Sequence, residues 1–516
     1  MQTLTVATGA YPVLSVMVLV PLIGALLLAI PALRGQARGL GLTIAIAELG
    51  LGIWAAILFD PHAGTVYQLA ETRHWIPAMG VSWALGVTGL GLAMLLLAVF
   101  LVPIVLLASW GEIPADRQAG FASLILALEA FIVVIFTARD VLLFYLVFEA
   151  MLIPVYFLIG RYGGPDRRRA AIKFLLYSLA GGLVMLIGVV ALTVYGPGGD
   201  ENYLIQNLSQ GLTSSTGVTR GIFVTFLIAF AIKAPMVPLH TWLPDTAEQA
   251  TPGTSVLLIG VLDKIGTYGM IAIVLPLFPE ASRWAAPVIL PLAIVGIIYG
   301  GLAAIGQDHL YRLISYTSIS HFGFMVLGIF IGNQVAAVGA MVYMVAHGLS
   351  IAGLYLITGF MARRTGTVRI SELGGIARVM PLIAGTFLFS GLASIALPGL
   401  SGFIPEWMVL TGSFSAKPVY GILALLGVII AAVYMLLPYQ RVFTGAPAAE
   451  RVGSQDLDGR ERVVVAPIIV AMLVLGLAPA ALTGILDGVG AQTAATMTGA
   501  GSQSAATAPV TEGSSK

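Results

Sequence analysis

A succession of apolar stretches, each about 20 residues long, limits what this chain can fold into more than any other feature. Of its 516 residues, 58% are hydrophobic and 9% are charged, whereas a soluble domain has roughly 25% charged residues. The pattern predicts an all-α polytopic membrane protein. We expect about 14 transmembrane helices, at residues 12–31, 40–59, 84–108, 119–137, 141–160, 170–195, 221–245, 252–276, 284–305, 312–331, 335–361, 381–411, 418–440 and 464–487.

Proline and glycine interrupt two of these stretches, the seventh and the twelfth. The segment KAPMVP breaks 221–245, and LPGLSGFIPE breaks 381–411. Proline lacks the N–H group that a helix needs and clashes with the carbonyl four residues before it. Transporters place such broken helices at their ion sites. The breaks also indicate two inverted five-helix repeats, helices 4–8 and 9–13, because the fourth helix of each set is broken and an odd number of helices inverts the second set.

The same spacing divides the chain into five parts. We expect three helices in 1–118, the first repeat in 119–276, the second repeat in 284–440, and a cytoplasmic loop with the last helix in 441–488. Residues 489–516 are rich in Ala, Ser, Thr and Gly, which is typical of a disordered tail. No basic residue precedes the first apolar stretch, as a signal peptide would require, so we expect that helix to stay in the mature protein.

The distribution of basic residues predicts the orientation. Seventeen of the 25 Lys and Arg residues fall in loops on one side of the predicted membrane and six on the other. The positive-inside rule therefore predicts a multi-pass protein of the bacterial plasma membrane with both termini outside the cytoplasm. The net charge of +1 gives no reason to expect nucleic-acid binding. Without cysteine, and with six histidines that form no ligand motif, we expect no metal and no cofactor in this chain.

The two remaining basic residues, Lys233 and Lys264, lie inside apolar stretches. A Lys at the centre of a membrane costs about 2.5–3.5 kcal/mol even on the lenient scale, so it normally serves a pathway or a partner. Twenty of the 25 basic residues are Arg, yet both deep residues are Lys. Lysine gives up its proton when it loses water, whereas Arg stays charged. The choice of Lys favours a proton carrier; the alternative is a structural ion pair.

Few other titratable residues lie at this depth. Glu149 is the natural counter-ion for Lys233, either as part of a switch or as a permanent brace between helices. Glu406 follows the second break and would be the last proton acceptor. His321 and His347 lie between Lys264 and Glu406 in chain order and are either relays or packing residues. Weaker candidates are Glu129, Asp140 and Asp263, and a group that forms an uptake site or caps a half-helix, namely His240, Trp242 and Asp245.

Four segments resemble a known family. FYLVFEAMLIPVYFLIGRYG, FAIKAPMVPLHTWLPDTAEQATPGTSVLLIGVLDKIGTYGM, YRLISYTSISHFGFMVLGI and SGFIPEWMVL are similar to the antiporter-like subunits of proton-pumping NADH–quinone oxidoreductase, respiratory complex I. The resemblance covers about residues 84–465. Glu406 resembles the subunit M (chain 4) branch, since the sister subunits L and N carry Lys there.

The resemblance implies roles for named residues and partners. It implies that Glu149 and Lys233 are the family's ion pair, Lys264 its central lysine, His321 and His347 its connecting histidines, and Glu406 its terminal carboxylate. It also implies that FMN, iron–sulfur clusters and quinone bind to partner subunits. The expected partners are the other membrane and peripheral subunits of the complex, neighbouring antiporter-like subunits above all, together with membrane lipids and protons.

Two positions depart from the family pattern. Thr88 stands where the family has Asp, and HLYRLISYTSISH has His309 and Tyr311 where Asp and Lys are usual, although Arg312 follows. The hypothesis from sequence is a proton path from the cytoplasm to Lys233, along Lys264 and the histidines to Glu406, and then outward. Alternatives are a subunit of a cation/proton antiporter or membrane-bound hydrogenase, a structural scaffold, and a stand-alone transporter.

Overall fold

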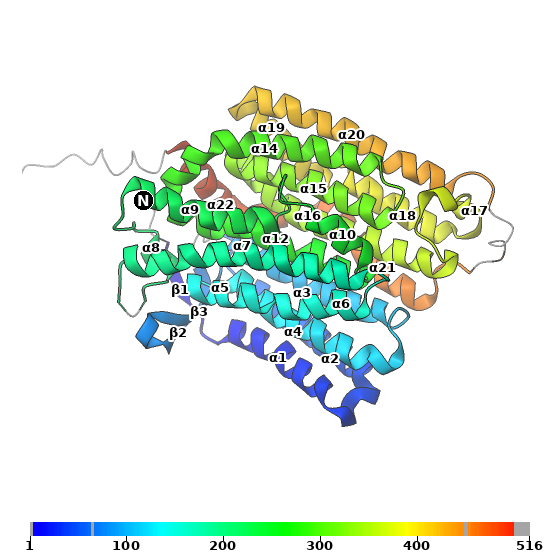
Figure 1. The fold of residues 1–516 in the computed structure, drawn as a ribbon, viewed down its shortest axis with the longest axis horizontal. Helices are drawn as coiled ribbons and strands as arrows, with labels where there is room; N and C mark the ends of the chain where they lie inside the picture. The colour runs from blue at the N-terminus through cyan, green and yellow to red at the C-terminus, as the bar shows by residue number, and fades with distance from the viewer. Residues whose placement is uncertain (1–3, 63–66, 200, 448–452, 454, 500–516) are drawn as a thin grey trace, which may run out of the picture.

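The computed structural model describes residues 4–62, 67–199, 201–447, 453 and 455–499. Its helices lie roughly side by side, with the amino-terminal helices at one edge and α19 and α20 at the opposite edge (Figure 1). The long helices are α1 (Val13–Ala29), α2 (Ala37–Leu58), α3 (Gly89–Ser109), α4 (Gln118–Thr137), α5 (Val141–Ala150), α6 (Leu152–Tyr162), α7 (Arg167–Tyr195), α9 (Thr216–Lys233), α14 (Pro279–Ile305), α15 (Leu310–Phe330), α16 (Gln334–Thr365), α18 (Pro381–Ser394), α19 (Phe403–Ala416), α20 (Pro418–Phe443), α21 (Gly459–Leu477) and α22 (Ala480–Thr498).

Short helices connect or continue these. They are α8 (Ile205–Leu208), α10 (Trp242–Gln249), α11 (Pro252–Leu257), α12 (Lys264–Gly269), α13 (Leu275–Leu277) and α17 (Ile376–Val379). Turns of 3₁₀ helix are η1 (Pro31–Gln36), η2 (Pro77–Met79), η3 (Ala115–Arg117) and η6 (Ile370–Glu372), and π-helical turns are η4 (Leu258–Leu262) and η5 (Met270–Val274).

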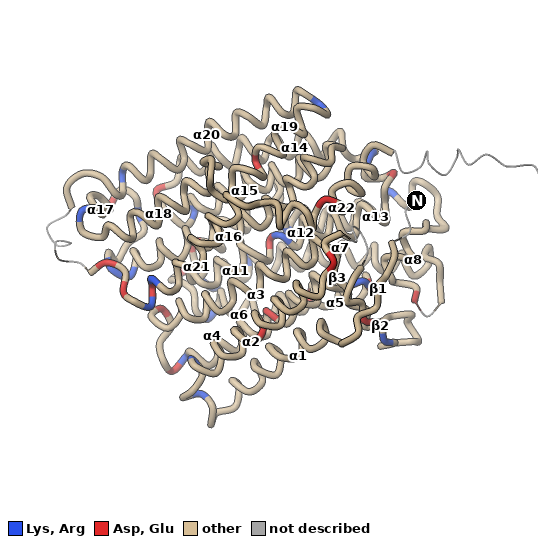
Figure 2. Tube along the Cα trace, turned by 180° about the vertical axis from the view of Figure 1, so that it is seen from behind, with Lys and Arg blue, Asp and Glu red and all other residues tan. Residues whose placement is uncertain are grey.

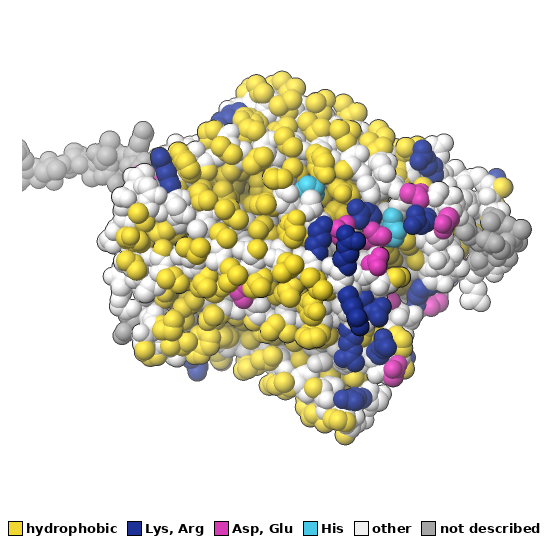
Figure 3. Space-filling view, in the orientation of Figure 1, with side chains coloured by type: hydrophobic (Ala, Val, Ile, Leu, Met, Phe, Trp, Pro, Cys, Tyr) yellow, Lys and Arg dark blue, Asp and Glu magenta, His cyan; other side chains and the backbone are white. Residues whose placement is uncertain are grey.

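The described residues contain 11 helices that are long and apolar enough to cross a membrane, or 12 if one bent pair is counted as a single span. α1 and α18 are apolar but shorter. The prediction of a multi-pass membrane protein is thus confirmed, and the number of 14 stays a prediction. Charged residues gather at the two ends of the bundle, with few in its middle (Figure 2), and Lys and Arg form a dense group toward one end of the face seen in Figure 3.

Three expectations need correction. The fold is not purely α-helical, because β1 (Val6–Thr8), β2 (Tyr67–Ile76) and β3 (Val81–Val87) form a small sheet in the order β1-β2-β3. Strand β3 also takes the start of the predicted helix 84–108, which begins only at Gly89. The predicted tail from 489 is helical up to Thr498. Residues 448–452 of the predicted loop and 500–516 of the predicted tail lie outside the described residues.

The sheet is held by polar side chains from the next helix pair. Strands β2 and β3 pair antiparallel, whereas β1 runs parallel to β2. Arg139, predicted as an external loop residue, is buried and donates from Nε to the Leu85 carbonyl at 3.1 Å. Asp140, a weaker candidate, caps α5 by accepting the Leu142 and Leu143 N–H groups, both at 2.9 Å. Asp140 is therefore explained as a helix cap.

Both predicted helix breaks are present. α9 ends at Lys233 and α10 begins at Trp242, while α18 ends at Ser394 and α19 begins at Phe403. The helix that follows the first break, residues 252–277, is regular only in part, because two π-helical turns flank α12. It packs at the centre of the bundle together with α15 and α16, and nearly all of its residues are buried.

Candidate proton-transfer site

Lys264 is fully buried and points toward α16. Its Nζ donates to the Ile259 carbonyl at 2.5 Å and lies 2.6 Å from Nδ1 of His347. Ile259 belongs to the π-helical turn η4, whose wider winding places a carbonyl within reach of a side chain five residues later. The Phe322 ring lies 5.2 Å from Nζ. Lys264 is thus held by one carbonyl, one imidazole and one aromatic face.

The two histidines lie against each other between α15 and α16. The ring centroids of His321 and His347 are 5.1 Å apart, with an angle of 77° between the rings. Both side chains are buried. Nε2 of His347 and Nδ1 of His321 make no hydrogen bond with the described part of the chain. These two nitrogens are therefore the free ends through which the rings could exchange a proton.

Two tyrosines continue from His321 to Glu406. The Tyr434 hydroxyl of α20 lies 3.0 Å from Nε2 of His321. The Tyr343 hydroxyl of α16 donates to Oε2 of Glu406 at 2.6 Å, and its ring centroid is 5.6 Å from that of His321. Glu406 is 3% exposed, although it sits at the start of α19 beside the second break. Tyr343 thus links the histidine pair to the buried carboxylate, and Tyr434 bonds to His321 beside it.

Together these residues form what we call the buried line: Lys264, His347, His321, Tyr434, Tyr343 and Glu406. The order in space differs from the order in the chain, since His347, and not His321, contacts Lys264. Sequence analysis missed both tyrosines. Tyr343 had a signal, because it precedes His347 by four residues and so shares its helix face. Tyr434 comes from a distant helix and had none.

Lys233, by contrast, stands apart. It is the last residue of α9 and is 1% exposed. Its Nζ makes no hydrogen bond with the described residues, and it lies 5.6 Å from the Phe148 ring and 5.2 Å from the Phe174 ring. Glu149 turns its carboxylate toward Gly182 of α7, where a Cβ atom would collide with it. The direct Glu149–Lys233 pair that the sequence predicts is not formed in this structure.

Asp263 takes a more central position than expected. Both of its oxygens are buried without a hydrogen-bond donor among the described residues. It interacts electrostatically with Lys264 and with Lys233, and for Lys233 it is a stronger influence than Glu149. The π-helical turn η4 ends just before Asp263, and α12 begins at Lys264, so the two residues do not belong to one regular helix. Asp263 is thus a buried carboxylate that acts electrostatically on both lysines.

The α10 side of the first break carries an ion cluster. Asp245 of α10 accepts hydrogen bonds from Lys173 at 2.6 Å and from Arg312 at 2.7 Å, and Arg312 also binds Glu248 at 2.9 Å. His240 lies 3.3 Å from the Tyr299 hydroxyl. Of the three residues predicted to cap a half-helix, Trp242 does so, because its indole N–H donates to the Ile232 carbonyl in the last turn of α9 at 2.9 Å, whereas no side chain caps the start of α10.

The departures from the family pattern are accommodated locally. Thr88 caps α3 by accepting the Gly91 N–H at 3.3 Å, as an Asp would. Tyr311 stacks on Tyr355 with ring centroids 5.6 Å apart, so its position is filled by packing and not by charge. Glu129 is fully buried beside Glu48 and has no link to the buried line.

Comparison with known proteins shows which family has this sequence and fold. Residues 138–431 match the transmembrane family described as NADH:quinone oxidoreductase/Mrp antiporter. Subunit M of NADH-quinone oxidoreductase from Mycobacterium tuberculosis is 43% identical over 515 residues, which covers 92% of this chain and 93% of that protein. A chain of respiratory complex I from Thermus thermophilus superimposes with a TM-score of 0.84 at 32% identity, covering 94% of this chain and 100% of that one.

A chain of the Mrp complex from a Dietzia species shares the fold, with a TM-score of 0.80 at 22% identity over 94% of this chain and 97% of that one. The two solved structures are both multi-subunit assemblies. By the extent of the match and the identity to its relatives, the chain belongs to the NADH:quinone oxidoreductase/Mrp antiporter family of membrane subunits.

Proposed function

We propose that this chain is the subunit M-type proton-translocating subunit of a bacterial NADH–quinone oxidoreductase. The observation that carries the proposal is the buried line, in which Lys264 and Glu406 are joined through two histidines and two tyrosines. Ionisable groups buried inside a membrane protein are costly and mark functional sites, proton relays among them. Family membership and the identity to subunit M relatives support the assignment to this complex.

The geometry suggests how a proton crosses the second half of the chain. Protonated Lys264 donates to Nδ1 of His347, and the proton on the other ring nitrogen passes to the free Nδ1 of His321. His321 then gives up the proton on Nε2 to the Tyr434 hydroxyl, which releases its own proton toward Glu406, whose carboxylate accepts a hydrogen bond from Tyr343. Each imidazole is left neutral but with its proton on the other ring nitrogen, so it must return to its starting tautomer before it takes the next proton.

The first half supplies Lys264. In the proposed path a proton from the cytoplasm reaches Lys233 at the helix break, and Asp263 attracts it toward Lys264. Among the described residues no hydrogen-bond partner holds Lys233, so moving its side chain breaks no hydrogen bond to them. Glu149, next to Gly182, is placed to act as a movable counter-charge and not as a fixed brace.

Several finer features belong to the same proposal. These are 14 transmembrane helices arranged as two inverted five-helix repeats, location in the plasma membrane, and both termini outside the cytoplasm. FMN, iron–sulfur clusters and quinone would sit on partner subunits, which is supported by the absence of cysteine from this chain. The driving force would then reach this subunit through its contacts within the complex.

The test is Lys233→Ala in the assembled complex, with proton translocation and NADH–quinone turnover measured in the same membranes. We expect intact assembly on a native gel and loss of pumping. Lys417→Ala, which removes an exposed Lys far from the line, is the matched control and should pump normally. Unchanged pumping in Lys233→Ala would contradict the path, lost assembly would favour a scaffold, and a requirement for Na⁺ would favour an antiporter complex.

A further inference from the structure

A cleft with an apolar part and a polar part lies between α9 and α14. The apolar part has a volume of about 370 Å³, which is within the range of small-molecule sites. Every residue that lines it is apolar: Phe223, Val224, Leu227, Ile228, Ala231, Met236, Val237, Pro238, Leu239, Trp284, Ala285, Val288, Ile289 and Leu292. No proton-transfer residue takes part in it.

This apolar part opens to the membrane and is as long as one leaflet is deep. Val288 is 64% exposed, Trp284 48% and Ile228 36%. The lining runs from Phe223 to Ala231 along α9 and from Trp284 to Leu292 along α14, which is about 12 Å at the helical rise per residue. Half of a hydrocarbon core is about 15 Å. The dimensions fit an acyl chain of one leaflet and are too short for a spanning helix.

The inner end of the cleft is the helix break itself. Met236, Val237, Pro238 and Leu239 line it, and Pro238 is exposed. Irregular backbone at membrane depth has to be covered. The N–H groups of Met236 and Leu239 already bond to the carbonyls of Ala231 and Met236, and proline has no N–H. Whatever covers the helix break therefore needs to exclude water more than it needs to form hydrogen bonds with the backbone.

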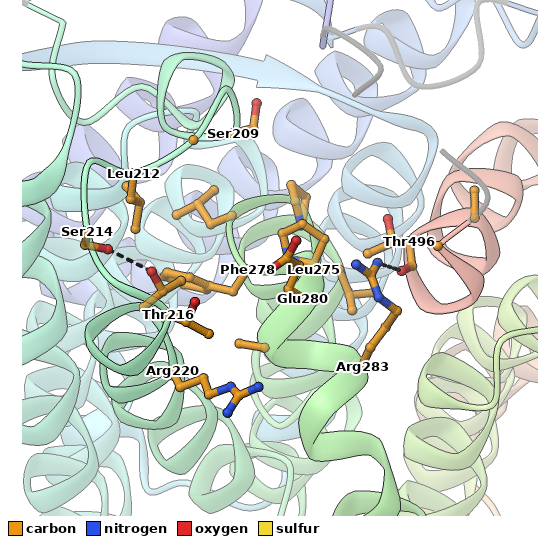
Figure 4. A pocket seen from close by; sticks show the side chains of 18 of the residues that line it. Ser209, Leu212, Ser214, Thr216, Arg220, Leu275, Phe278, Glu280, Arg283 and Thr496 are labelled. Carbon is orange, nitrogen blue, oxygen red and sulfur yellow. Dashed lines mark hydrogen bonds between the residues drawn. The ribbon is translucent and has the colours of Figure 1, made fainter. Parts of the chain in front are cut away.

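The outer end carries charged and hydroxyl groups, with a surplus of positive charge. A second cavity of about 460 Å³ lies there, lined in part by Arg220, Arg283 and Glu280 (Figure 4). Hydroxyl groups add to the lining, from Ser209, Ser214, Thr216, Thr219 and Thr496, and apolar residues such as Leu212, Leu275 and Phe278 form much of the rest. The Arg220 guanidinium lies 4.8 Å from the centre of the Trp284 ring, and Trp284 lines the apolar part. This contact places the two cavities next to each other, with Arg220 on one side and Trp284 on the other.

We propose that the cleft binds an anionic phospholipid of the outer leaflet. Its phosphate lies between Arg220 and Arg283, whose two charges exceed the single charge of Glu280, and the hydroxyl groups accept and donate around it. One acyl chain fills the apolar part and seals the broken helix beside Lys233 from the membrane side. A neighbouring protein helix is the competing occupant. The lipid is favoured because the apolar part is about as long as one leaflet is deep and charged groups lie at only one of its ends.

The test uses the whole complex in nanodiscs and phosphatidylglycerol with a photoreactive group in an acyl chain. We expect cross-links on the peptides that contain Phe223–Ala231 and Trp284–Leu292. Ala231→Phe fills the apolar part and should abolish these cross-links. Arg220→Gln with Arg283→Gln should weaken binding roughly 25-fold, at about 1 kcal/mol for each Arg and 1.4 kcal/mol for each tenfold change. Lys417→Gln is the matched control and should bind normally.

A competition in the unaltered complex keeps the proposal testable if a variant fails to assemble. Unlabelled phosphatidylglycerol should displace the probe, and phosphatidylcholine should not. Equal displacement by both lipids would overturn the anionic headgroup. Absence of labelling in the complex, with labelling of the separated chain, would show that a protein neighbour covers the cleft and would overturn the lipid. None of these outcomes depends on whether Lys233 carries protons.

Discussion

The two halves of the chain treat their buried charges differently. In the second half, contacts run without a gap from Lys264 to His347, from His347 to His321 through edge-on rings, from His321 to the Tyr343 ring, and from the Tyr343 hydroxyl to Glu406, while Tyr434 bonds to His321 from the side. In the first half, Lys233 has aromatic rings around it and no hydrogen bond with the described residues. A connected line of donors and acceptors can pass on a proton as soon as it receives one. An isolated ammonium can pass on its proton only after its side chain or an acceptor has moved. We infer that loading of the line is controlled at the first break.

The helix breaks match this difference. At the first break a Lys ends the half-helix α9, so its positive charge lies at the negative end of the helix dipole. At the second break Glu406 lies in the first turn of α19, at the positive end of that dipole. Each half-helix thus stabilises the charged form of its own residue. The first residue is held as a cation that waits for a partner, and the second as an anion that attracts a proton.

The largest effect is expected at Lys264, where the connected line begins. Lys264→Ala removes the donor to His347, and we expect pumping to fall at least 100-fold, the lower range for loss of a proton-transfer group. Lys264→Arg should fail as well, because Arg keeps its proton. Proton uptake by vesicles during NADH oxidation gives the measurement. A structural brace would instead be rescued by Arg, so normal pumping in Lys264→Arg would contradict the relay.

The next effect separates the two carboxylates near Lys233. Because Asp263 influences both lysines, Asp263→Asn should lower pumping about tenfold or more and at least as much as Glu149→Gln. Both substitutions keep the side-chain volume, so assembly on a native gel should be unchanged. If Asp263→Asn pumps normally while Glu149→Gln does not, the predicted Glu149–Lys233 pair forms during turnover and the arrangement seen here is one state of a switch.

Much of this could be predicted from sequence, for physical reasons that apply to particular residues. Lys233 and Lys264 stand out because a charge in an apolar stretch is costly, and the breaks stand out because proline cannot continue a helix. Strand β3 could not be separated from the apolar stretch that follows it. The position of Asp263 depends on π-helical turn η4, which an apolar sequence does not reveal. Tyr434 reaches His321 from 113 residues away, and only tertiary packing brings them together.

A smaller effect is expected where a tyrosine links His321 to Glu406. Tyr434→Phe removes one hydroxyl, and we expect pumping to fall about tenfold, corresponding to about 1.4 kcal/mol, which is within the range for one hydrogen bond. Tyr343→Phe should act similarly at Glu406. Tyr439→Phe on the same helix is the matched control, since its ring stacks on Phe443 and lies outside the line. Equal pumping by all three variants would remove the tyrosines from the path.

The smallest effect is expected at the ion cluster around Asp245, on the α10 side of the first break. Asp245→Asn breaks the contacts to Lys173 and Arg312, but these side chains are 37%, 30% and 27% exposed. Exposed ion pairs contribute about 0–1 kcal/mol, and salt screens them within about 8 Å. We expect a slight loss of thermal stability that disappears at high salt, with pumping nearly unchanged. A large, salt-independent loss of pumping would instead make Asp245 the uptake site and move control from Lys233 to the surface. In that case the first half would pass protons as directly as the second, and the step that controls proton entry would lie at the membrane surface and not at Lys233.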